Sequence, residues 1–407
     1  MSKLNELIRE LCPDGVEYKP ISNCVDKVTN IKWAKSDGSE YQYIDLTSVD
    51  RDTHTITETQ TINAENAPSR AQQIIKSGDI LFGATRPMLK RYCMIDDSFD
   101  GQICSTGFCV LRAKENVALQ RWLYHNISST DFFSHVEKLQ KGASYPAISD
   151  ADVKSYRIPV PPIEIQREIV RILDKFTMLS AELSAELSAR QRQYAYFRDE
   201  LLTFENNVTV ITKKIGEISH YRRGSFPQPY GKAEWYDGDG AMPFVQVADI
   251  GEDMRLVDDT KRKISKVAQP KSVFAPKGSI IISLQGSIGR IAVTQFDAYI
   301  DRTVAIFQDI SKELHPKYFV YQLQRVFAQK EKTARGGTIK TITKEEFAEF
   351  PIDIPPLAVQ QRIVSILDRF DMLCNDLSAG LPAEIEARNK QYEYYRDKLL
   401  SFEPTKQ

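Results

Sequence analysis

The sequence predicts an α+β protein: two mixed α/β domains joined by two long antiparallel helices that pair as a coiled coil, with pseudo-two-fold symmetry. Three observations support this class: an internal repeat, a heptad pattern in the repeated segments, and mixed strand and helix patterns between them. A chain of 407 residues has room for two or three domains of roughly 150 residues each. The predicted order is a first domain at 1–157 with a short N-terminal helix, a helix at 158–206, a second domain at 207–352 and a helix at 353–407.

The internal repeat has two well-matched blocks. PIEIQREIVRILDKFTML at 162–179 recurs as PLAVQQRIVSILDRFDML at 356–373, with ten of eighteen positions identical at an offset of 194. RQRQYAYFRDELLTFE at 190–205 recurs as RNKQYEYYRDKLLSFE at 388–403, with ten of sixteen positions identical at an offset of 198. The second copy has therefore gained four residues between the blocks, and the chain consists of two copies of one unit.

Both repeated segments carry apolar or aromatic residues at alternating steps of four and three, which is typical of a coiled-coil helix. A single such stripe is more often the core-facing side of an ordinary helix, but two matched stripes in one chain favour mutual pairing. The predicted helix-pairing residues are Ile169, Leu173, Phe176, Leu183, Leu187, Tyr194, Phe197, Leu201, Ile363, Leu367, Phe370, Leu377, Tyr392, Tyr395 and Leu399.

The direction and continuity of the two helices also follow from the sequence. The termini of a compact domain usually lie close together, so the second helix begins near the end of the first and the pair runs antiparallel. The four extra residues act as a stutter in the second helix, and Gly380 and Pro382 lie there. We therefore expect a kink or break at this point.

The diverged segments read as mixed α/β domains. Phe108–Arg112, Ser279–Ser283 and Arg290–Thr294 have strand patterns, whereas Leu119–His135 and Pro316–Lys330 read as amphipathic helices. Basic and polar side chains gather in the glycine-containing loops, where they suit phosphate contact and base-edge reading. Any one of them has a solvated surface role as its simpler explanation, but the set favours a DNA face. The predicted DNA-binding residues are Arg86, Lys90, Arg91, Lys141, Ser144, Arg222, Arg223, Gln285, Arg290, Arg335, Thr338 and Lys340.

Composition and motifs argue against an enzyme. The net charge is −1, so a DNA-binding surface requires basic residues to be segregated onto one face. The six cysteines include no CxxC pair, and the five histidines match no metal or triad spacing, so we expect no metal and no catalytic residue. The Pro-Pro pairs at 161–162 and 355–356 lack the preceding polar and following aromatic residues of amino-methyltransferase motifs.

The chain is expected to be cytoplasmic. It has no apolar run of the ~18 residues that a membrane span needs, and its first ten residues are polar, without the apolar core of a signal peptide.

The order of these elements resembles the specificity subunit of Type I restriction-modification systems. The resemblance covers essentially the whole chain and includes the run Lys277–Ile282, then Gly286–Arg290, then Gly336–Thr338, and Ile-Pro-Pro356 before a glutamine-rich helix start. The doubled Ser-Ala-Glu-Leu at 180–187 resembles a short tandem repeat in the central helix of one subgroup of this family.

The resemblance implies two target-recognition domains that each read one half of a bipartite double-stranded DNA site. It also implies that the helices set the spacing and dock two methyltransferase subunits, and that restriction subunits complete the nuclease. S-adenosylmethionine, ATP and Mg would then act in the partner subunits, with no cofactor in this chain.

Two other hypotheses remain open at this point. A coiled-coil scaffold that binds no DNA predicts unchanged DNA affinity when Arg223 and Arg335 are replaced by alanine. A free-standing nuclease or methyltransferase predicts activity from the purified chain alone, and the missing motifs argue against it.

Overall fold

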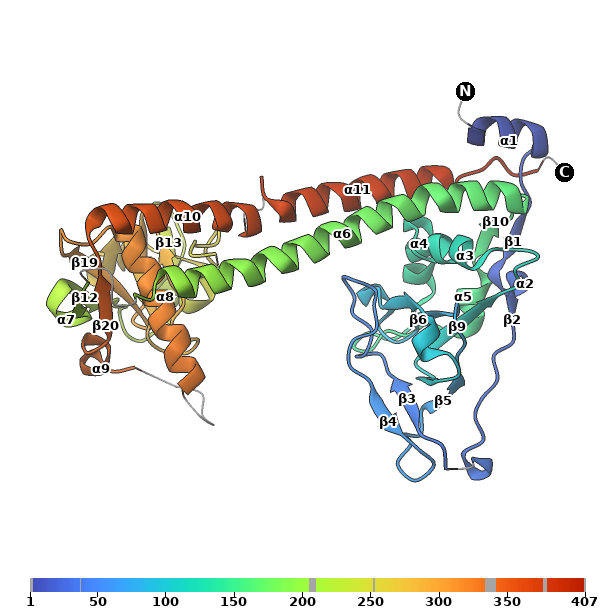
Figure 1. The fold of residues 1–407 in the computed structure, drawn as a ribbon, viewed down its shortest axis with the longest axis horizontal. Helices are drawn as coiled ribbons and strands as arrows, with labels where there is room; N and C mark the ends of the chain where they lie inside the picture. Colours follow the sequence, from blue (N-terminus) through green and yellow to red (C-terminus); the bar gives the residue numbers. More distant parts are fainter. Residues whose placement is uncertain are drawn as a thin grey trace. The chain divides into compact units, whose positions relative to one another are not determined.

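A computed structural model describes residues 3–36, 38–204, 210–251, 253–333, 342–375 and 379–405 (Figure 1). The chain divides into two compact units, Met1–Glu182 with Ile385–Gln407, and Leu183–Glu384. The longest helix, α6 (Ile163–Leu201), contributes its first half to the first unit and its second half to the second. Each unit therefore combines a mixed domain with a stretch of paired helices, and the predicted α+β class is confirmed.

The first domain contains two four-stranded sheets and a two-stranded ribbon, in the orders β2-β9-β6-β7, β4-β3-β8-β5 and β1-β10. Within them the pair β3–β8 is parallel and the other pairs are antiparallel. The strands are β1 (Tyr18–Pro20), β2 (Val25–Asp26), β3 (Tyr41–Ile44), β4 (Gln60–Ile62), β5 (Ala71–Ile74), β6 (Ile80–Gly83), β7 (Tyr92–Met94), β8 (Ile103–Ser105), β9 (Phe108–Ala113) and β10 (Arg157–Pro159).

The second domain repeats this topology strand for strand. Its sheets run β12-β19-β16-β17, β14-β13-β18-β15 and β11-β20, and the pair β13–β18 is again parallel. The strands are β11 (Ile211–Lys214), β12 (Ser219–Arg223), β13 (Met242–Val245), β14 (Arg262–Ile264), β15 (Val273–Ala275), β16 (Ile280–Ser283), β17 (Ile291–Val293), β18 (Ala298–Ile300), β19 (Val304–Ile310) and β20 (Pro351–Ile354). The weak sequence repeat between the domains therefore reflects one shared fold.

Helices pack against the sheet β2-β9-β6-β7 in the first domain and against β12-β19-β16-β17 in the second. In each domain a large apolar core forms there, against the start of a long helix. The helices of the first domain are α1 (Lys3–Leu11), α2 (Ile21–Cys24), α3 (Gln120–Ile127), α4 (Thr130–Leu139) and α5 (Asp150–Ser155). Those of the second domain are α7 (Ile215–Ile218), α8 (Pro316–Thr333) and α9 (Lys344–Ala348).

Both copies of the repeat have a glutamine at the same position, and its side chain joins the long helix to the domain through hydrogen bonds. Gln166 accepts a hydrogen bond from the backbone N–H of Leu119 at 2.9 Å and donates to the Pro161 carbonyl at 2.8 Å. Gln360 does the same with His315 at 2.8 Å and Pro355 at 2.7 Å. Both glutamine side chains are fully buried, so the hydrogen bonds satisfy polar groups that burial would otherwise make costly.

The segment Leu119–His135, predicted as one helix, forms two. α3 ends at Ile127, and α4 begins at Thr130 with Ser129 as its N-cap, because the Ser129 hydroxyl accepts from the backbone N–H of Phe132. A capping serine satisfies a free N–H of the new helix, which favours a restart there. The spacing of apolar residues continues across residues 127–130, so the sequence pattern alone does not indicate the break between the two helices.

The repeated segments pair as expected within each unit. In the first unit the rings of Phe176 on α6 and Tyr395 on α11 (Leu381–Leu399) stack at 5.4 Å. In the second unit Tyr194 and Phe197 on α6 lie 6.1 Å and 5.7 Å from Phe370 on α10 (Leu357–Asn375). The start of α6 thus pairs with the end of the repeated segment, and the end of α6 with its start, which is the predicted antiparallel arrangement.

The expected interruption near Gly380 and Pro382 is confirmed, since α10 ends at Asn375 and α11 begins at Leu381. Beyond α11, the final residues return to the first domain, where Val16 and Pro404 form a parallel bridge and the Tyr18 hydroxyl donates to the Phe402 carbonyl at 3.0 Å. Among the described helices, none combines the length and apolar character needed to cross a bilayer.

Candidate nucleic-acid interface

In the first domain, the turn between β6 and β7 lies against the loop at 141–148. The backbone N–H of Ile148 donates to the Ala84 carbonyl at 2.9 Å, and that of Arg86 donates to the Pro146 carbonyl at 2.6 Å. Gly142 has a φ of +104°, and a Cβ there would lie 2.9 Å from the Tyr145 carbonyl oxygen. A glycine is therefore needed for the loop to fold back on itself.

Four of the predicted DNA-binding residues meet on this pair of loops, and all four are exposed: Arg86, Lys90, Lys141 and Ser144. The Arg86 guanidinium lies over the ring of Tyr145 at 4.4 Å, and the Lys90 ammonium lies over the ring of Phe133 at 5.0 Å. An aromatic ring beneath a cation orients it without neutralising it. The arrangement can bind phosphate oxygens and base edges.

Arg91 differs from these four because it is half-buried and hydrogen-bonds the Leu46 carbonyl through Nη1. The equivalent Arg290 in the second domain donates from Nη1 to the Ile250 carbonyl at 3.1 Å. Both guanidinium groups thus hold a neighbouring loop, although the Arg91 Nε has no hydrogen-bond partner. Their predicted contact with DNA would come in addition to this structural role.

In the second domain the predicted DNA-binding residues lie on several separate elements and not on one pair of loops. Gln285, in the turn after β16, and Arg222 on β12 are exposed, whereas Arg223 is half-buried and donates to the Ile342 carbonyl at 2.9 Å. The remaining three predicted residues, Arg335, Thr338 and Lys340, lie outside the described residues.

A basic cluster over aromatic rings in the second domain lies outside the twelve predicted DNA-binding residues. Lys232 and Lys271 lie 4.9 Å and 4.8 Å from the ring centre of Trp235, and Arg262 lies 4.7 Å from that of Tyr236. Lys232 lies between Tyr230 and the Trp235-Tyr236 pair in the sequence, which is a local signal that could have indicated this surface. The distant Lys271 carries no such signal, because the fold alone brings it to Trp235.

The β7 region of the first domain contains a stacked histidine. His54, with a left-handed φ of +54°, stacks on Tyr92 with ring centres 3.9 Å apart. Burial lowers the pKa of His54 to about 4, against the opposing effect of Asp50 and Asp52. The ring is therefore neutral at pH 7 and adds no positive charge to the neighbouring basic loops.

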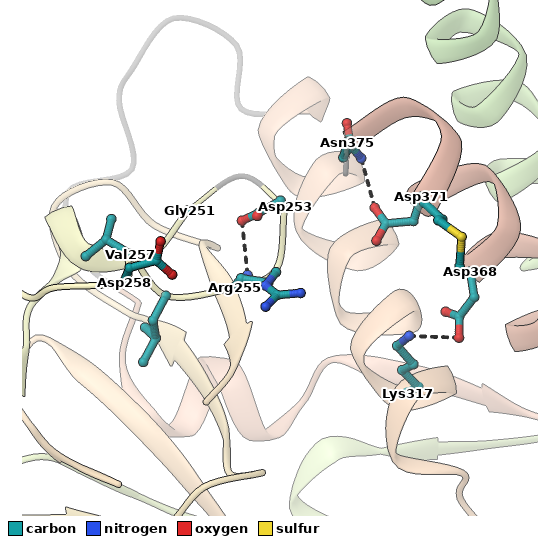
Figure 2. Close-up of a pocket in the computed structure, with 11 residues that line it drawn as sticks. Gly251, Asp253, Arg255, Val257, Asp258, Lys317, Asp368, Asp371 and Asn375 are labelled. Carbon is teal, nitrogen blue, oxygen red and sulfur yellow. Dashed lines mark hydrogen bonds and ion pairs between the residues drawn. The ribbon is translucent and has the colours of Figure 1, made fainter. Parts of the chain in front are cut away.

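A cavity of about 660 Å³ lies in the second unit and has the wrong charge for DNA (Figure 2). Its carboxylates, from the 251–258 loop and α10, outnumber its two cations: Asp253, Asp258, Asp368 and Asp371, against Arg255 and Lys317. Lys317 is also engaged, because its ammonium lies 2.7 Å from an Asp368 oxygen. Phosphates would be repelled here, and within the described part of the chain no group of three histidine, cysteine or carboxylate side chains could hold a metal ion.

The predicted helix-pairing residues fall into groups with different surroundings. One group is buried in the two large domain cores: Ile169, Leu173, Ile363 and Leu367. A second group, Leu183 and Leu187, is half-buried, and Leu377 lies outside the described residues. Leu201 and Leu399 pack at the edges of the two large cores, as does Tyr392. Five aromatic residues lie against one another between the helices: Phe176 contacts Tyr395, and Tyr194 and Phe197 contact Phe370.

Comparison with known proteins adds to this geometry. The family model of the Type I restriction modification DNA specificity domain matches residues 8–190 and 207–387. The EcoR124I/EcoR124II specificity subunit of Escherichia coli is 35% identical over 72% of this chain and 73% of its own length. A putative type I specificity subunit of Haemophilus influenzae is 32% identical over 72% of this chain and 74% of its own.

Solved structures agree on the fold. A chain from a study of complex assembly and conformational transition in the type I R-M system superposes with a TM-score of 0.68 at 26% identity, covering 95% of this chain and 98% of that one. The S subunit from M. genitalium superposes with a TM-score of 0.54 at 14% identity, covering 95% and 96%, and this likeness concerns the fold alone.

Proposed function

Because the chain belongs to the family of Type I restriction-modification DNA specificity subunits, we propose that each of its domains reads one half of a bipartite DNA site. The paired helices set the spacing between the half-sites and dock two methyltransferase subunits, which restriction subunits join. A specificity subunit is a non-catalytic component of its system, and the cofactors belong to the methyltransferase and restriction subunits. This family membership rules out the scaffold without DNA recognition and the stand-alone enzyme.

The observation that carries the two-half-site proposal is the shared topology of the two domains. Both have the same sheet orders, an equivalent parallel strand pair (β3–β8 and β13–β18) and an equivalent turn, β6–β7 in the first domain and β16–β17 in the second. Yet the exposed side chains in that turn differ, with Arg86 and Lys90 in one domain and Gln285 in the other. Two copies of one reading scaffold with different side chains suit two different half-sequences.

Co-expression with the methyltransferase subunit of the same system, followed by genome-wide mapping of modified adenines, tests this proposal. We expect a split recognition sequence that appears only when this chain is present. A continuous site, or a methylation pattern unaffected by this chain while the methyltransferase is folded, would contradict it.

An insertion in α6 tests the spacing role separately. One extra Ser-Ala-Glu-Leu after Leu187 adds four residues to the helix, or about 6 Å at ~1.5 Å per residue. Since base pairs rise by about 3.4 Å, we expect the spacer to lengthen by one or two base pairs with unchanged half-sites. The control replaces Ser184 and Glu186 by alanine, which preserves the length of the helix and its pairing residues and should preserve the spacer. An altered half-site in the insertion variant would overturn the spacing role.

A further inference from the structure

The turn between β6 and β7 holds two side chains in a strained backbone conformation. Arg86 and Lys90 have φ values of +49° and +53°, and they bracket a short 3₁₀ turn at Pro87–Leu89. A residue with a side chain in this left-handed region costs about 1 kcal/mol or more, and such strain gathers at functional sites. The turn therefore retains these two side chains at an energetic cost.

The second domain makes the equivalent turn without that cost. Its turn joins β16 to β17, and the Ser283 N–H donates to the Arg290 carbonyl at 2.8 Å, as the Gly83 N–H does to the Arg91 carbonyl at 2.8 Å. Its left-handed positions are Gly286 and Gly289, with φ values of +80° and +82°. Glycine adopts this conformation freely, so the side chains of Arg86 and Lys90 are not needed to form the turn.

The tip between Arg86 and Lys90 is apolar and exposed. Met88 and Leu89 are 37% and 38% exposed, whereas Pro87 is buried and fixes the base of the turn. Tyr145, 71% exposed, lies beside Arg86 and extends the apolar surface. In the second domain, by contrast, Ile288 is half-buried against the core. The β6–β7 turn thus presents a short tip with two apolar side chains between two cations, and the equivalent turn of the second domain does not.

We propose that Met88 and Leu89 form a wedge that inserts between two stacked base pairs of the half-site read by the first domain. Arg86 and Lys90 bind the phosphates on either side of the opened step. Methionine, leucine and proline are among the residues that proteins insert between base steps, and the cost of unstacking is offset by added contacts to the bent DNA. This inference rests on the proposed half-site reading and adds a distortion that only one half-site undergoes.

The test uses the complex of this chain with its methyltransferase subunits and duplexes carrying the mapped site. 2-Aminopurine replaces one base at a time, since its fluorescence rises when stacking is lost. We expect a rise at one step of one half-site, apart from the rise at the adenine that the methyltransferase extrudes. The double substitution Met88→Ser/Leu89→Ser should abolish the first rise, leave the second, and weaken binding about tenfold, or ~1.4 kcal/mol.

Val267→Ser is the matched control, because Val267 is a 63% exposed apolar residue of the second domain. It should leave fluorescence and affinity unchanged, and both variants should melt as the unsubstituted chain does, because the altered side chains are exposed.

Three results would overturn the wedge. The first is a fluorescence rise that persists in the double variant, and the second is the absence of any rise beyond that of the target adenine. The third is an equal loss of affinity when thymine is replaced by uracil in a duplex that shows no unstacking, because that loss indicates contact with a thymine methyl group. If binding stays specific in these cases, the wedge alone fails. If the unsubstituted complex does not distinguish the mapped duplex from a scrambled one, the half-site proposal fails and the wedge with it.

Discussion

The two units join their long helices to their domains at equivalent positions but with different chemistry. In the first unit the fully buried His125 on α3 links the two helices: its Nδ1 lies 2.8 Å from the Tyr392 hydroxyl of α11 and its Nε2 lies 2.9 Å from Asp174 of α6. Arg121 also donates to Asp174, at 2.6 Å. Because a carboxylate only accepts, the neutral ring donates from Nε2 and accepts from Tyr392 at Nδ1.

In the second unit a tyrosine replaces the histidine. Tyr321, 196 residues after His125, donates its hydroxyl to Asp368 at 2.7 Å, and Lys317 takes the place of Arg121 at 2.7 Å from the same carboxylate. Tyr194, the counterpart of Tyr392, stacks on Phe370 instead of joining this group. The repeat thus preserves the positions at which helices and domain meet. Hydrogen bonds join the domain to both helices in the first unit, whereas in the second unit they reach α10 and Tyr194 of α6 packs on Phe370 instead.

The largest effect is expected for His125→Ala. The substitution opens a buried cavity and removes the hydrogen bond that His125 makes to Asp174 and the one it makes to the Tyr392 hydroxyl, while Arg121 still binds Asp174. We therefore expect a loss of about 3 kcal/mol in the free energy of unfolding. Hydrogen exchange of the α3 amides measures it. The matched variant Tyr321→Phe removes one hydrogen bond and leaves the Lys317–Asp368 pair, so about 1 kcal/mol should be lost around α8. Equal losses in the two units would show that the junctions are energetically alike.

Gly289→Ala tests the difference between the two turns and should cost about 2–3 kcal/mol. A Cβ at Gly289 would lie 2.8 Å from the Phe327 ring, in addition to the strain of a positive φ. Gly286→Ala is the matched control, because its φ is also positive but no atom lies within 4 Å of the added Cβ. It should cost about 1 kcal/mol, and urea titration of both variants would show the difference. Similar midpoints would mean that Phe327 moves aside freely.

Acid should weaken the first unit before the second. Burial lowers the pKa of both His54 and His125, that of His54 from 6.5 to about 4. Below pH 6.5 the unfolded state therefore binds protons that the folded state excludes, and stability is lost as the pH falls toward 4. Between pH 7 and pH 5.5 we expect His54 to account for a loss of about 1 kcal/mol.

Hydrogen exchange of the β7 and α3 amides at the two pH values measures this loss. His54→Asn, which tolerates the left-handed conformation, should remove the part that depends on His54. A loss of the same size in the asparagine variant would show that other groups cause the pH dependence.

The smallest effect is expected for Tyr392→Phe. It removes the hydroxyl that donates a hydrogen bond to His125, which should lower the free energy of unfolding by about 1 kcal/mol. The melting temperature of the full chain would detect this loss. Tyr194→Phe leaves the stacking on Phe370 in place and should change stability by less than about 0.5 kcal/mol. The reverse order of the two losses would contradict the assignment of hydrogen bonding to the first junction.

Much of the architecture could be predicted because its signals are local. Heptad spacing predicted the paired helices, and Gly380 with Pro382 predicted their interruption. The restart of a helix at Ser129 was missed, although a capping residue is a local signal, because the apolar spacing around it continues. Periodicity reports which side of an element is buried but not whether its backbone is continuous.

The candidate site could be predicted only in part, because exposure depends on distant contacts. Arg86 and Lys141 were both predicted to bind DNA, but it is the backbone bonding of the 84–86 and 146–148 segments that brings them together. Arg91 and Arg290 have the same composition signal as Arg86, yet each turns toward a carbonyl of a neighbouring loop. Residue type alone does not distinguish an arginine that faces solvent from one that satisfies a buried carbonyl.

The sequence by itself determined that the chain is a repeat of two units, that its repeated segments are helices that pair, and that it resembles the Type I specificity family. These properties follow from short-range periodicity and from identity between copies, both of which are visible along the chain. The tertiary structure decided which segments close each unit, including the return of Pro404 to Val16, and which cations remain exposed. Those outcomes depend on packing between residues hundreds of positions apart, and no local pattern encodes such contacts.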